Sequence, residues 1–304
     1  MNARKFIMRT IKVAVSLYIL YWAIIFLTLV YNSFTEPHEY LASDYRIFKD
    51  TPAWDLAKAV RDADTAEIRY QILEKKIPVN YQEQKYGESM LSIATYQNNI
   101  KSVKKLLELG ADPNLYVDTI NRSGQNPVIK ACKSKKISIE ILKLLLDYGG
   151  NPNAVTKGVN GNNPYRITAL ETAASLGGLE KVKMLMNYGA DVNFTPDRDY
   201  DTDPLKESLI GIADMKVALY LLEHGAKFNK EYLNPYTNEK ESIVDILRMK
   251  IFPLDSSDYF YKVKIIEFLK KNGIDYYKTP VPDWIVDKIK NKYPNTWKEY
   301  IVKY

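Results

Sequence analysis

Four aspartates alternate along the segment DRDYDTDP, which begins at residue 197. They are Asp197, Asp199, Asp201 and Asp203. This spacing resembles the opening of a calcium loop of the EF-hand type, in which alternate residues supply oxygen ligands. That loop also needs glycine at its sixth position and glutamate at its twelfth, and these positions hold Thr202 and Ser208. We therefore expect no metal, and interpret the segment as an acidic loop in which Asp203 caps the next helix.

Other reactive side chains are few. The single cysteine, Cys132, excludes an intrachain disulfide and lies in IKACKS, on a predicted helix without a base nearby in the sequence. One of the two histidines, His224, precedes a helix-ending glycine, where an imidazole is favoured by the helix dipole. The glycine-rich segment GVNGNNP is not preceded by a strand or followed at once by a helix, so it does not predict a phosphate loop. We expect no enzyme and no cofactor.

Composition and charge favour a globular protein that does not bind nucleic acid. Hydrophobic residues make up 46% and charged residues 26% of the 304 residues. The net charge is +6, and residues 1–12 supply +4 of it through Arg4, Lys5, Arg9 and Lys12. The other 292 residues therefore carry only +2.

Residues 13–31, VAVSLYILYWAIIFLTLVY, contain no formal charge. As a helix they would span about 28 Å, close to the thickness of a hydrocarbon core. The alternative is a cleaved signal peptide, but the apolar run is long for one and no cleavage motif follows it. Residues 1–12 carry four basic residues, whereas residues 32–50 carry two. By the positive-inside rule we expect a single-pass protein of the bacterial inner membrane, with a cytoplasmic N-terminus and a periplasmic body.

The phrase LLELGADPN at 106–114 recurs along the chain. Clear copies stand at 145–153, 185–193 and 221–229, and weaker ones, ILEKKIPVN and FLKKNGIDY, at 72–80 and 268–276. A stacked repeat needs such copies, because each unit must offer its neighbour the same packing surface. Each phrase ends an amphipathic helical pattern, in which we expect Leu107, Leu145 and Leu221 to be core residues. The glycine predicts a left-handed helix end.

A second signature lies upstream of the clear phrases, in GESMLSIA (87–94), GQNPVIKA (124–131), TALETA (168–173) and DPLKES (203–208). A short polar residue begins a helix, an aliphatic residue lies two positions later and a small residue five positions later. Together the two signatures resemble the ankyrin repeat over residues 51–277. The resemblance implies an all-α solenoid of about six helix-turn-helix units with extended hairpin fingers. The sequence departs from the family pattern at Lys76, where the first unit lacks the glycine, and at Asn229 to Ser242, where the last unit has no clear TPLHxA. The last unit also has about ten extra residues between its two helices, around 251–260.

Most of the extra length between repeats precedes an inner helix, which predicts long fingers at 115–125, 154–167, 194–203 and 230–241. Loop insertions in repeats usually mark the binding face, although a longer surface loop is also tolerated at little cost. Tyrosine and arginine are the residue types that most often carry interface energy, and an acidic finger suits a basic partner surface. We therefore expect a protein partner to contact Tyr81, Tyr86, Tyr116, Arg122, Tyr165, Arg166, Asp197, Arg198, Asp199, Tyr200, Asp201, Tyr232 and Tyr236.

The two ends of the repeat region differ from its middle. Thr51 and Pro52 predict the start of the first helix, as a cap followed by proline. Near the C-terminus, Pro282 and Pro294 predict the starts of two helices that cover the last repeat, with partner binding as the alternative. We expect Trp284, Ile285 and Ile289 to share one face of the first of these helices. The expected domains are a basic cytoplasmic tail (1–12), a transmembrane signal anchor (13–31), a linker (32–50), an ankyrin-repeat domain (51–277) and a C-terminal helical cap (278–304).

A short signal anchor followed by an outward-facing ankyrin domain resembles certain membrane-anchored bacterial immunity proteins. Those proteins neutralise phospholipase toxins delivered by type VI secretion. The resemblance is one of architecture, and it implies a toxin partner encoded by an adjacent gene. The alternative is a periplasmic ankyrin scaffold that supports another protein, such as a stress enzyme. In both cases the expected function is non-catalytic protein binding at a membrane.

Overall fold

The computed structural model describes residues 41–117, 124–157, 166–198, 201–211, 214–234, 237–278 and 280–304. Residues 42–304 form one compact unit with its own hydrophobic core. The predicted basic tail, the predicted membrane span at 13–31 and the first part of the linker lie outside the described residues. Within the described ranges, no helix has the length and apolar character needed to cross a membrane.

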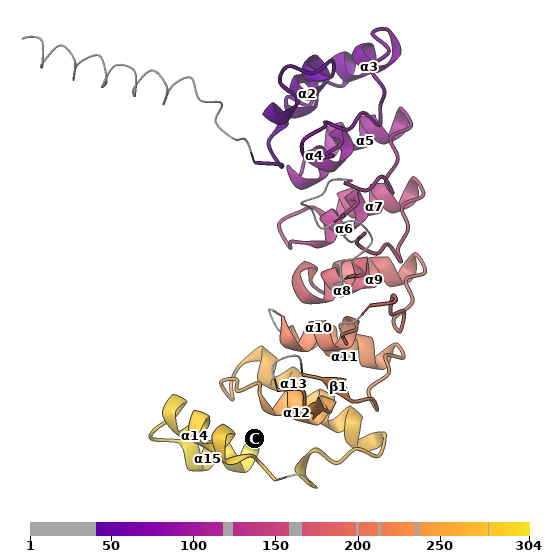
Figure 1. Ribbon diagram of the computed structural model, residues 1–304. Coiled ribbons are helices and arrows are strands. Elements are labelled where there is room, and N and C mark those ends of the chain that lie inside the picture. The colour runs from indigo at the N-terminus through magenta and orange to yellow at the C-terminus, as the bar shows by residue number, and fades with distance from the viewer. Residues whose placement is uncertain are drawn as a thin grey trace, which may run out of the picture. The chain divides into compact units, whose positions relative to one another are not determined.

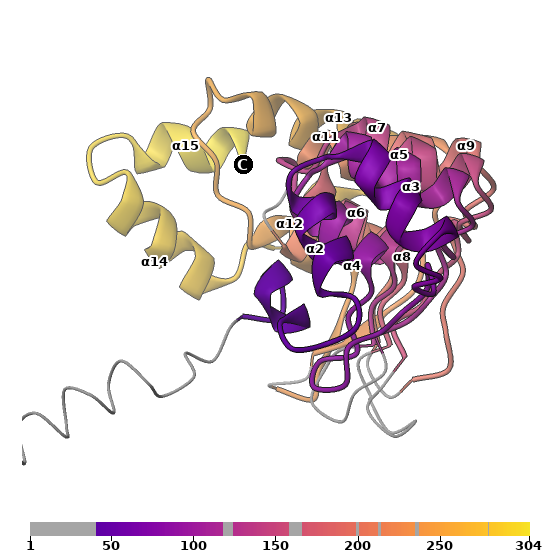
Figure 2. The ribbon, with the colours of Figure 1, turned by 90° about the horizontal axis from the view of Figure 1, so that it is seen from above.

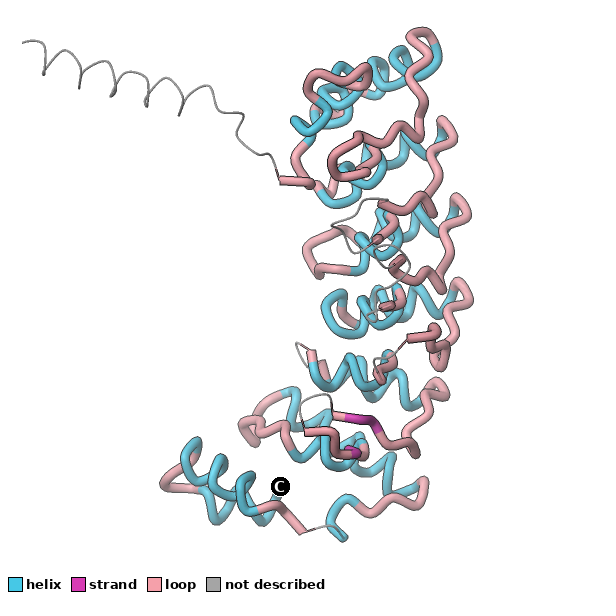
Figure 3. The backbone as a smooth tube through the Cα atoms, in the orientation of Figure 1, coloured by secondary structure: helices cyan, strands magenta, loops and turns pink. Residues whose placement is uncertain are grey.

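Six helix pairs follow one another in the described part of the chain (Figures 1 and 3). They are α2 (Trp54–Arg61) with α3 (Thr65–Leu73), α4 (Met90–Tyr96) with α5 (Ile100–Glu108), α6 (Pro127–Cys132) with α7 (Ile139–Asp147), α8 (Ala169–Thr172) and the π-helix η3 (Ala173–Gly177) with α9 (Leu179–Asn187), α10 (Pro204–Ile210) with α11 (Met215–Glu223), and α12 (Ile243–Arg248) with α13 (Ser257–Lys271). This confirms the expected helix-turn-helix unit and a mostly helical chain.

The first helix of each pair packs on the first helix of the next pair, and the second helix packs on the second. Viewed from above, the helices therefore form an inner and an outer column, and the connecting fingers project along one edge (Figure 2). Small residues at the inner helices, Ala94, Ala131 and Ala173, are fully buried, which allows the close approach of neighbouring repeats. Leu107, Leu145 and Leu221 are buried on the outer helices, as the helical spacing predicts.

The inner helices begin at the polar residues that the sequence indicates. Ser89, Asn126, Thr168 and Asp203 each accept a hydrogen bond from a backbone N–H of the first helical turn. At Thr168 the cap is reciprocal, because the side chain of Glu171 in turn accepts from the Thr168 N–H. These caps fix the point at which each finger ends and each helix starts.

The outer helices end in the left-handed backbone region. Gly110, Gly149, Gly189 and Gly225 have φ between 88° and 92°. A Cβ atom at any of them would meet no atom within 4 Å, so glycine is favoured there by backbone conformation and not by space. In the first repeat Lys76 takes the same region, with φ 59°, and so bears the conformational cost that glycine avoids.

The described parts of the fingers contain little regular sheet. The last finger forms a two-stranded antiparallel ladder, β1 (Tyr232–Leu233) with β2 (Lys240–Glu241). Single bridges join Gln82 to Ser89 and Val155 to Thr168 in two other fingers. The fingers are therefore held in place mainly by side-chain contacts.

The predicted start of the first helix is wrong by a few residues. α2 begins at Trp54, because the Thr51 hydroxyl donates to the Phe48 carbonyl and accepts from the Ala53 N–H, which makes a turn and not a helix cap. The 3₁₀ helix η1 (Tyr45–Phe48) precedes this turn, and Phe48 is buried in the core. The end of the expected linker is thus part of the packed unit.

The C-terminal segment forms the two expected helices, α14 (Asp283–Lys292) and α15 (Trp297–Lys303), after the 3₁₀ helix η4 (Tyr276–Lys278). α15 begins three residues after Pro294, where a start was predicted. Trp284, expected on the packed face of α14, is 48% exposed. A separate small core forms instead from buried Ile285, Ile289, Tyr300 and Tyr304.

The ten-residue insertion of the last repeat is the support for this cap. Ile251 and Leu254 pack against the small core. The Tyr300 hydroxyl donates to the Phe252 carbonyl at 2.7 Å, and Lys292 donates to the Ile251 carbonyl at 2.7 Å. The insertion is therefore explained by cap docking.

Candidate partner-binding surface

The closing asparagine of each phrase connects one repeat to the next. Asn153 Oδ1 accepts from the Asp191 N–H at 2.9 Å, and its Nδ2 donates to the Gly189 carbonyl at 3.1 Å. Asn114 and Asn193 make the same pair of bonds to the repeats that follow them. Asn80 accepts the corresponding N–H of Asp112. This asparagine ladder is the physical reason for the recurring phrase, and it fixes the base of each finger relative to its neighbours.

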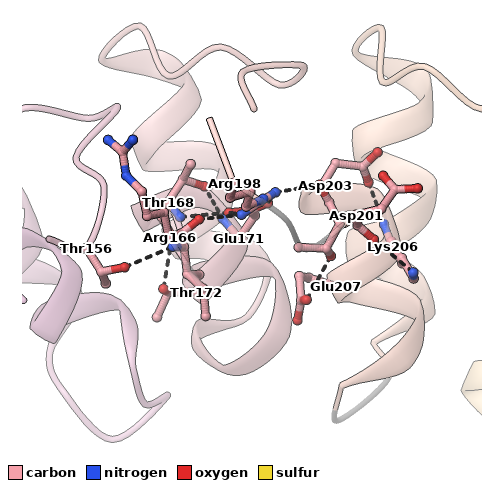
Figure 4. Close-up of polar contacts among 12 residues, drawn as sticks. Thr156, Arg166, Thr168, Glu171, Thr172, Arg198, Asp201, Asp203, Lys206 and Glu207 are labelled. Carbon is pink, nitrogen blue, oxygen red and sulfur yellow. Dashed lines mark hydrogen bonds and ion pairs between the residues drawn. The ribbon is translucent and has the colours of Figure 1, made fainter. Parts of the chain in front are cut away.

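A buried ion pair holds the finger at 194–203 (Figure 4). Arg198 donates to both oxygens of Glu171, and the two side chains are only 3% and 0% exposed. The same guanidinium donates to the backbone carbonyls of Arg166 and Thr202. Since Glu171 also caps α8, one carboxylate joins the start of this helix to the next finger along the chain.

A second carboxylate lies close to this pair. Glu207 on α10 accepts from the Thr202 hydroxyl at 2.8 Å (Figure 4). Burial, together with the negative charge of Glu171, raises the pKa of Glu207. The network thus concentrates polar groups under the finger bases, where each is paired within the protein.

The acidic finger is also bound by the protein's own donors. The Asp203 carboxylate forms an ion pair with Lys230 at 2.7 Å and accepts from the Tyr232 hydroxyl at 3.0 Å. Asp201 accepts from the Leu233 N–H at 3.0 Å. Lys206 donates to the Asp201 carbonyl and lies 4.9 Å from the centre of the Tyr232 ring. Burial lowers the pKa of Lys206.

These contacts bear on the calcium hypothesis. Asp203 caps α10 as expected, and both Asp201 and Asp203 point to lysine or amide donors. No cluster of three or more possible metal ligands occurs among the residues that the structure describes. The arrangement of these two carboxylates is that of a structural network.

Two of the predicted contact residues are buried and unsuited to bind a partner. The Arg198 guanidinium is enclosed by Glu171 and two carbonyls, and Tyr232 is fully buried against Asp203. We had expected both at an interface because their residue types favour one. Arginine and tyrosine combine a large contact area with directed hydrogen bonds. This suits them to the packed base of a finger as well as to an interface with a partner.

Other predicted residues remain accessible. Tyr81, Tyr86, Tyr116, Arg166 and Asp201 are partly exposed, and Asp197 is exposed. Arg122, Tyr165, Asp199, Tyr200 and Tyr236 lie outside the described residues.

Tyr116 shows how neighbouring fingers support one another. Its ring lies 4.3 Å from the Lys157 amine of the next finger, and its carbonyl accepts from Gln82 of the preceding one at 2.8 Å. Burial raises the pKa of its hydroxyl. In the same way Arg166 donates to the Asp197 carbonyl at 3.2 Å. The fingers therefore present a connected surface.

Sequence reasoning missed the partners that hold this surface. They include Glu171, Lys230, Gln82 and the buried pair of Glu88 with Lys130. One signal was available: Thr168 and Glu171 have the spacing of a capping box. The other partners are 27 to 42 residues apart in sequence, and no local pattern indicates them.

The remaining reactive candidates are structural. Cys132 is fully buried, and burial raises the pKa of its thiol to about 12, so the thiolate is scarce near neutral pH. His224 Nδ1 lies 2.8 Å from the Tyr220 carbonyl and its ring stacks on Tyr220, at the end of α11.

Comparison with known proteins agrees with this architecture. The family model described as ankyrin repeats (three copies) matches residues 115–196. The protein XBAT34 of Arabidopsis thaliana, which carries the name of an E3 ubiquitin-protein ligase, is 31% identical over 110 residues, covering 36% of this chain and 27% of that protein. Alpha-latroinsectotoxin-Lt1a of Latrodectus tredecimguttatus is 29% identical over 187 residues, covering 58% and 12% of the two chains. The ankyrin repeat protein FPV014 of fowlpox virus is 26% identical over 144 residues, covering 47% and 29%.

These matches confirm ankyrin repeats in the chain. The matched regions span less than a third of each of these relatives. The shared feature is thus the repeat, which in general serves protein–protein interaction and not catalysis. The repeats point to a protein partner for this chain.

Proposed function

We propose that this protein is a membrane-tethered, non-catalytic binding module that acts as an immunity protein. Its partner is a type VI secreted phospholipase toxin, encoded by an adjacent gene, which it blocks in the periplasm. The observation that carries the binding function is the connected finger surface, in which ladder bonds and buried ion pairs fix each finger base. The sequence supports the membrane location through the uncharged run at 13–31.

Fixed fingers suit inhibition by occlusion. A rigid binding surface loses little conformational entropy on association, so affinity does not require new chemistry. Tyr86 and Tyr116 contribute large, partly exposed aromatic area, and Arg166 adds a forked donor at the same edge. A tether on the membrane raises the effective concentration of this surface against an enzyme that arrives at the lipid.

Binding and inhibition are tested together with a soluble fragment that begins at about residue 36, which retains the compact unit. It should bind the purified lipase encoded by the neighbouring gene and stop its hydrolysis of phospholipid vesicles. Alanine at both Tyr86 and Tyr116 should weaken binding at least tenfold, or ~1.4 kcal/mol. The control is Tyr148→Ala, an exposed tyrosine at the end of the outer helix α7, which should leave the affinity unchanged.

Different failures have different meanings. Binding without inhibition would reject the immunity function and favour a scaffold that supports its partner. Equal losses for the finger and control variants would reject the fingers as the binding surface. A C-terminal alkaline phosphatase fusion in bacteria tests the location separately, and an inactive fusion would contradict the periplasmic orientation.

A further inference from the structure

The joint between the last repeat and the cap encloses a lysine. Lys262 on α13 is 1% exposed. Its amine donates to the Lys250 carbonyl at 3.0 Å. It also lies 3.9 Å from the centre of the Tyr304 ring, just after α15, and 5.5 Å from that of Tyr276 in η4. Three separate elements therefore close around one amine.

The groups that face this amine do not compensate a positive charge. α12 contributes Arg248, which donates to the Tyr276 carbonyl and lies 4.5 Å from its ring. Lys250, just before the insertion, contributes its carbonyl, and the rings of Tyr276 in η4 and of Tyr304 after α15 lie over the amine. Within the described residues no ion pair joins Lys262 to a carboxylate, and the charge acting on it is the repulsive one of Arg248.

The neutral amine is therefore the favoured form in the closed joint. Removing an ammonium from water costs more than the attraction of one or two tyrosine faces returns. Burial, and to a lesser extent the charge of Arg248, lowers the pKa of Lys262 from 10.5 to about 7. Tyrosine ring faces and a single carbonyl are sufficient surroundings for an uncharged amine.

The cap can move without disturbing the main core. Its apolar contacts belong to a separate cluster around Ile285 and Ile289. Its polar links to the stack include Tyr300 to the Phe252 carbonyl, Lys292 to the Ile251 carbonyl and, in the other direction, Tyr259 to the Lys303 carbonyl at 2.8 Å. Opening these links would admit water to Lys262 and uncover Ile251 and Leu254.

We propose that the α14–α15 cap is a proton-controlled latch: deprotonated Lys262 holds it on the last repeat, and protonation of Lys262 loosens it. The direction follows from the two states. With the cap open, Lys262 returns toward its ordinary pKa of 10.5, whereas with the cap closed its pKa is about 7. Lys262 therefore favours the closed state most strongly above pH 10.5, and this contribution falls as pH drops to about 7, by about tenfold in the closing equilibrium per pH unit. Below about 7 both states are protonated and the dependence ends.

Hydrogen exchange of the full-length chain in detergent micelles measures this equilibrium. After correction for the intrinsic exchange rate, protection of the α14 and α15 amides should rise about tenfold per pH unit from about pH 7.5 to 9. Protection of the α4 and α5 amides should not change. Lys262→Met should leave the cap protected and remove the pH dependence. The matched control is Lys264→Met, an exposed lysine two residues along α13, which should retain it.

Two outcomes would overturn the latch. One is cap protection in the native chain that does not vary with pH, and the other is an undiminished pH dependence in Lys262→Met. If Lys262→Met fails to hold the cap at any pH, the titration of the native Lys262 amine by ¹⁵N NMR decides. A value near the ordinary 10.5 rejects the proposal, and a value near 7 supports it.

Discussion

The junctions between repeats in the middle of the stack differ from the junction at its C-terminal end. In the middle, Asn153 and Asn193 bond to the following repeats, and Arg198 is neutralised by Glu171. At the end, the equivalent Asn229 is exposed and has no hydrogen bond among the described residues. The buried amine there, that of Lys262, lies against tyrosine rings. Hydrogen bonds with two fixed partners set register closely, whereas aromatic packing tolerates small shifts.

The difference indicates a division of labour. In the middle of the stack, hydrogen bonds and the Arg198–Glu171 ion pair hold the finger bases in one arrangement. The α14–α15 cap is joined to the last repeat mainly by apolar contacts around one titratable amine, that of Lys262. Its position can therefore respond to pH. The asparagine ladder stops before the last repeat, in which the insertion at 251–260 separates α12 from α13. The longer last repeat does not keep the spacing at which the earlier asparagines meet the repeat that follows them.

The largest expected effect comes from breaking the middle ion pair. Arg198→Met would leave the Glu171 carboxylate buried without its cation, which should cost ~3–5 kcal/mol of unfolding free energy. At the C-terminal joint, Lys262→Met removes an amine that no carboxylate requires, and stability near pH 7 should be unchanged or higher. Urea unfolding followed by circular dichroism compares the two variants. Equal losses of unfolding free energy would mean that Lys262, like Arg198, is required by a buried group that it compensates.

A smaller effect separates the two cores. Leu145→Ala in the main core should lower the unfolding free energy of the stack by ~2–4 kcal/mol. Ile289→Ala in the cap core should leave the main unfolding midpoint unchanged and reduce hydrogen-exchange protection of α14 and α15 alone. A matching loss in the main transition for Ile289→Ala would show that cap and stack unfold as one unit.

The ladder itself gives a third comparison. Asn153→Ala removes two hydrogen bonds to the next repeat and should cost ~1–2 kcal/mol. Asn229→Ala occupies the same place in the phrase but removes none, so it should change stability by less than ~0.5 kcal/mol. Thermal unfolding of both variants tests this. A clear loss for Asn229→Ala would reveal a coupling between the fifth and sixth repeats that hydrogen bonds do not explain.

The repeats were predictable because they rest on local chemistry. A cap at Thr168, a small residue at Ala173 and a glycine at Gly189 act within a few residues, so their spacing appears directly in the sequence. The site was less predictable, because its determinants are pairs such as Arg198 with Glu171 that meet only after stacking. The same limit applies to Tyr232. A tyrosine at this position predicts contact with a partner, but in the fold its hydroxyl donates to Asp203 and its ring is buried within the protein.

The smallest expected effect lies at the other end of the stack, where the first repeat departs from the phrase. Lys76 takes a left-handed backbone, with φ 59°, that glycine takes at Gly110 with φ 90°. Lys76→Gly should therefore stabilise the protein by up to ~1 kcal/mol, reduced by the greater freedom of glycine in the unfolded chain. Gly110→Ala is the reverse test: no atom lies within 4 Å of the new Cβ, so any loss, expected at ~1 kcal/mol, is due to the backbone alone. Thermal unfolding of both variants gives the two signs. If Lys76→Gly were destabilising, the lysine side chain would be contributing more than its backbone strain costs, and the first repeat would be a specialised N-terminal unit and not a weakened copy of its neighbours.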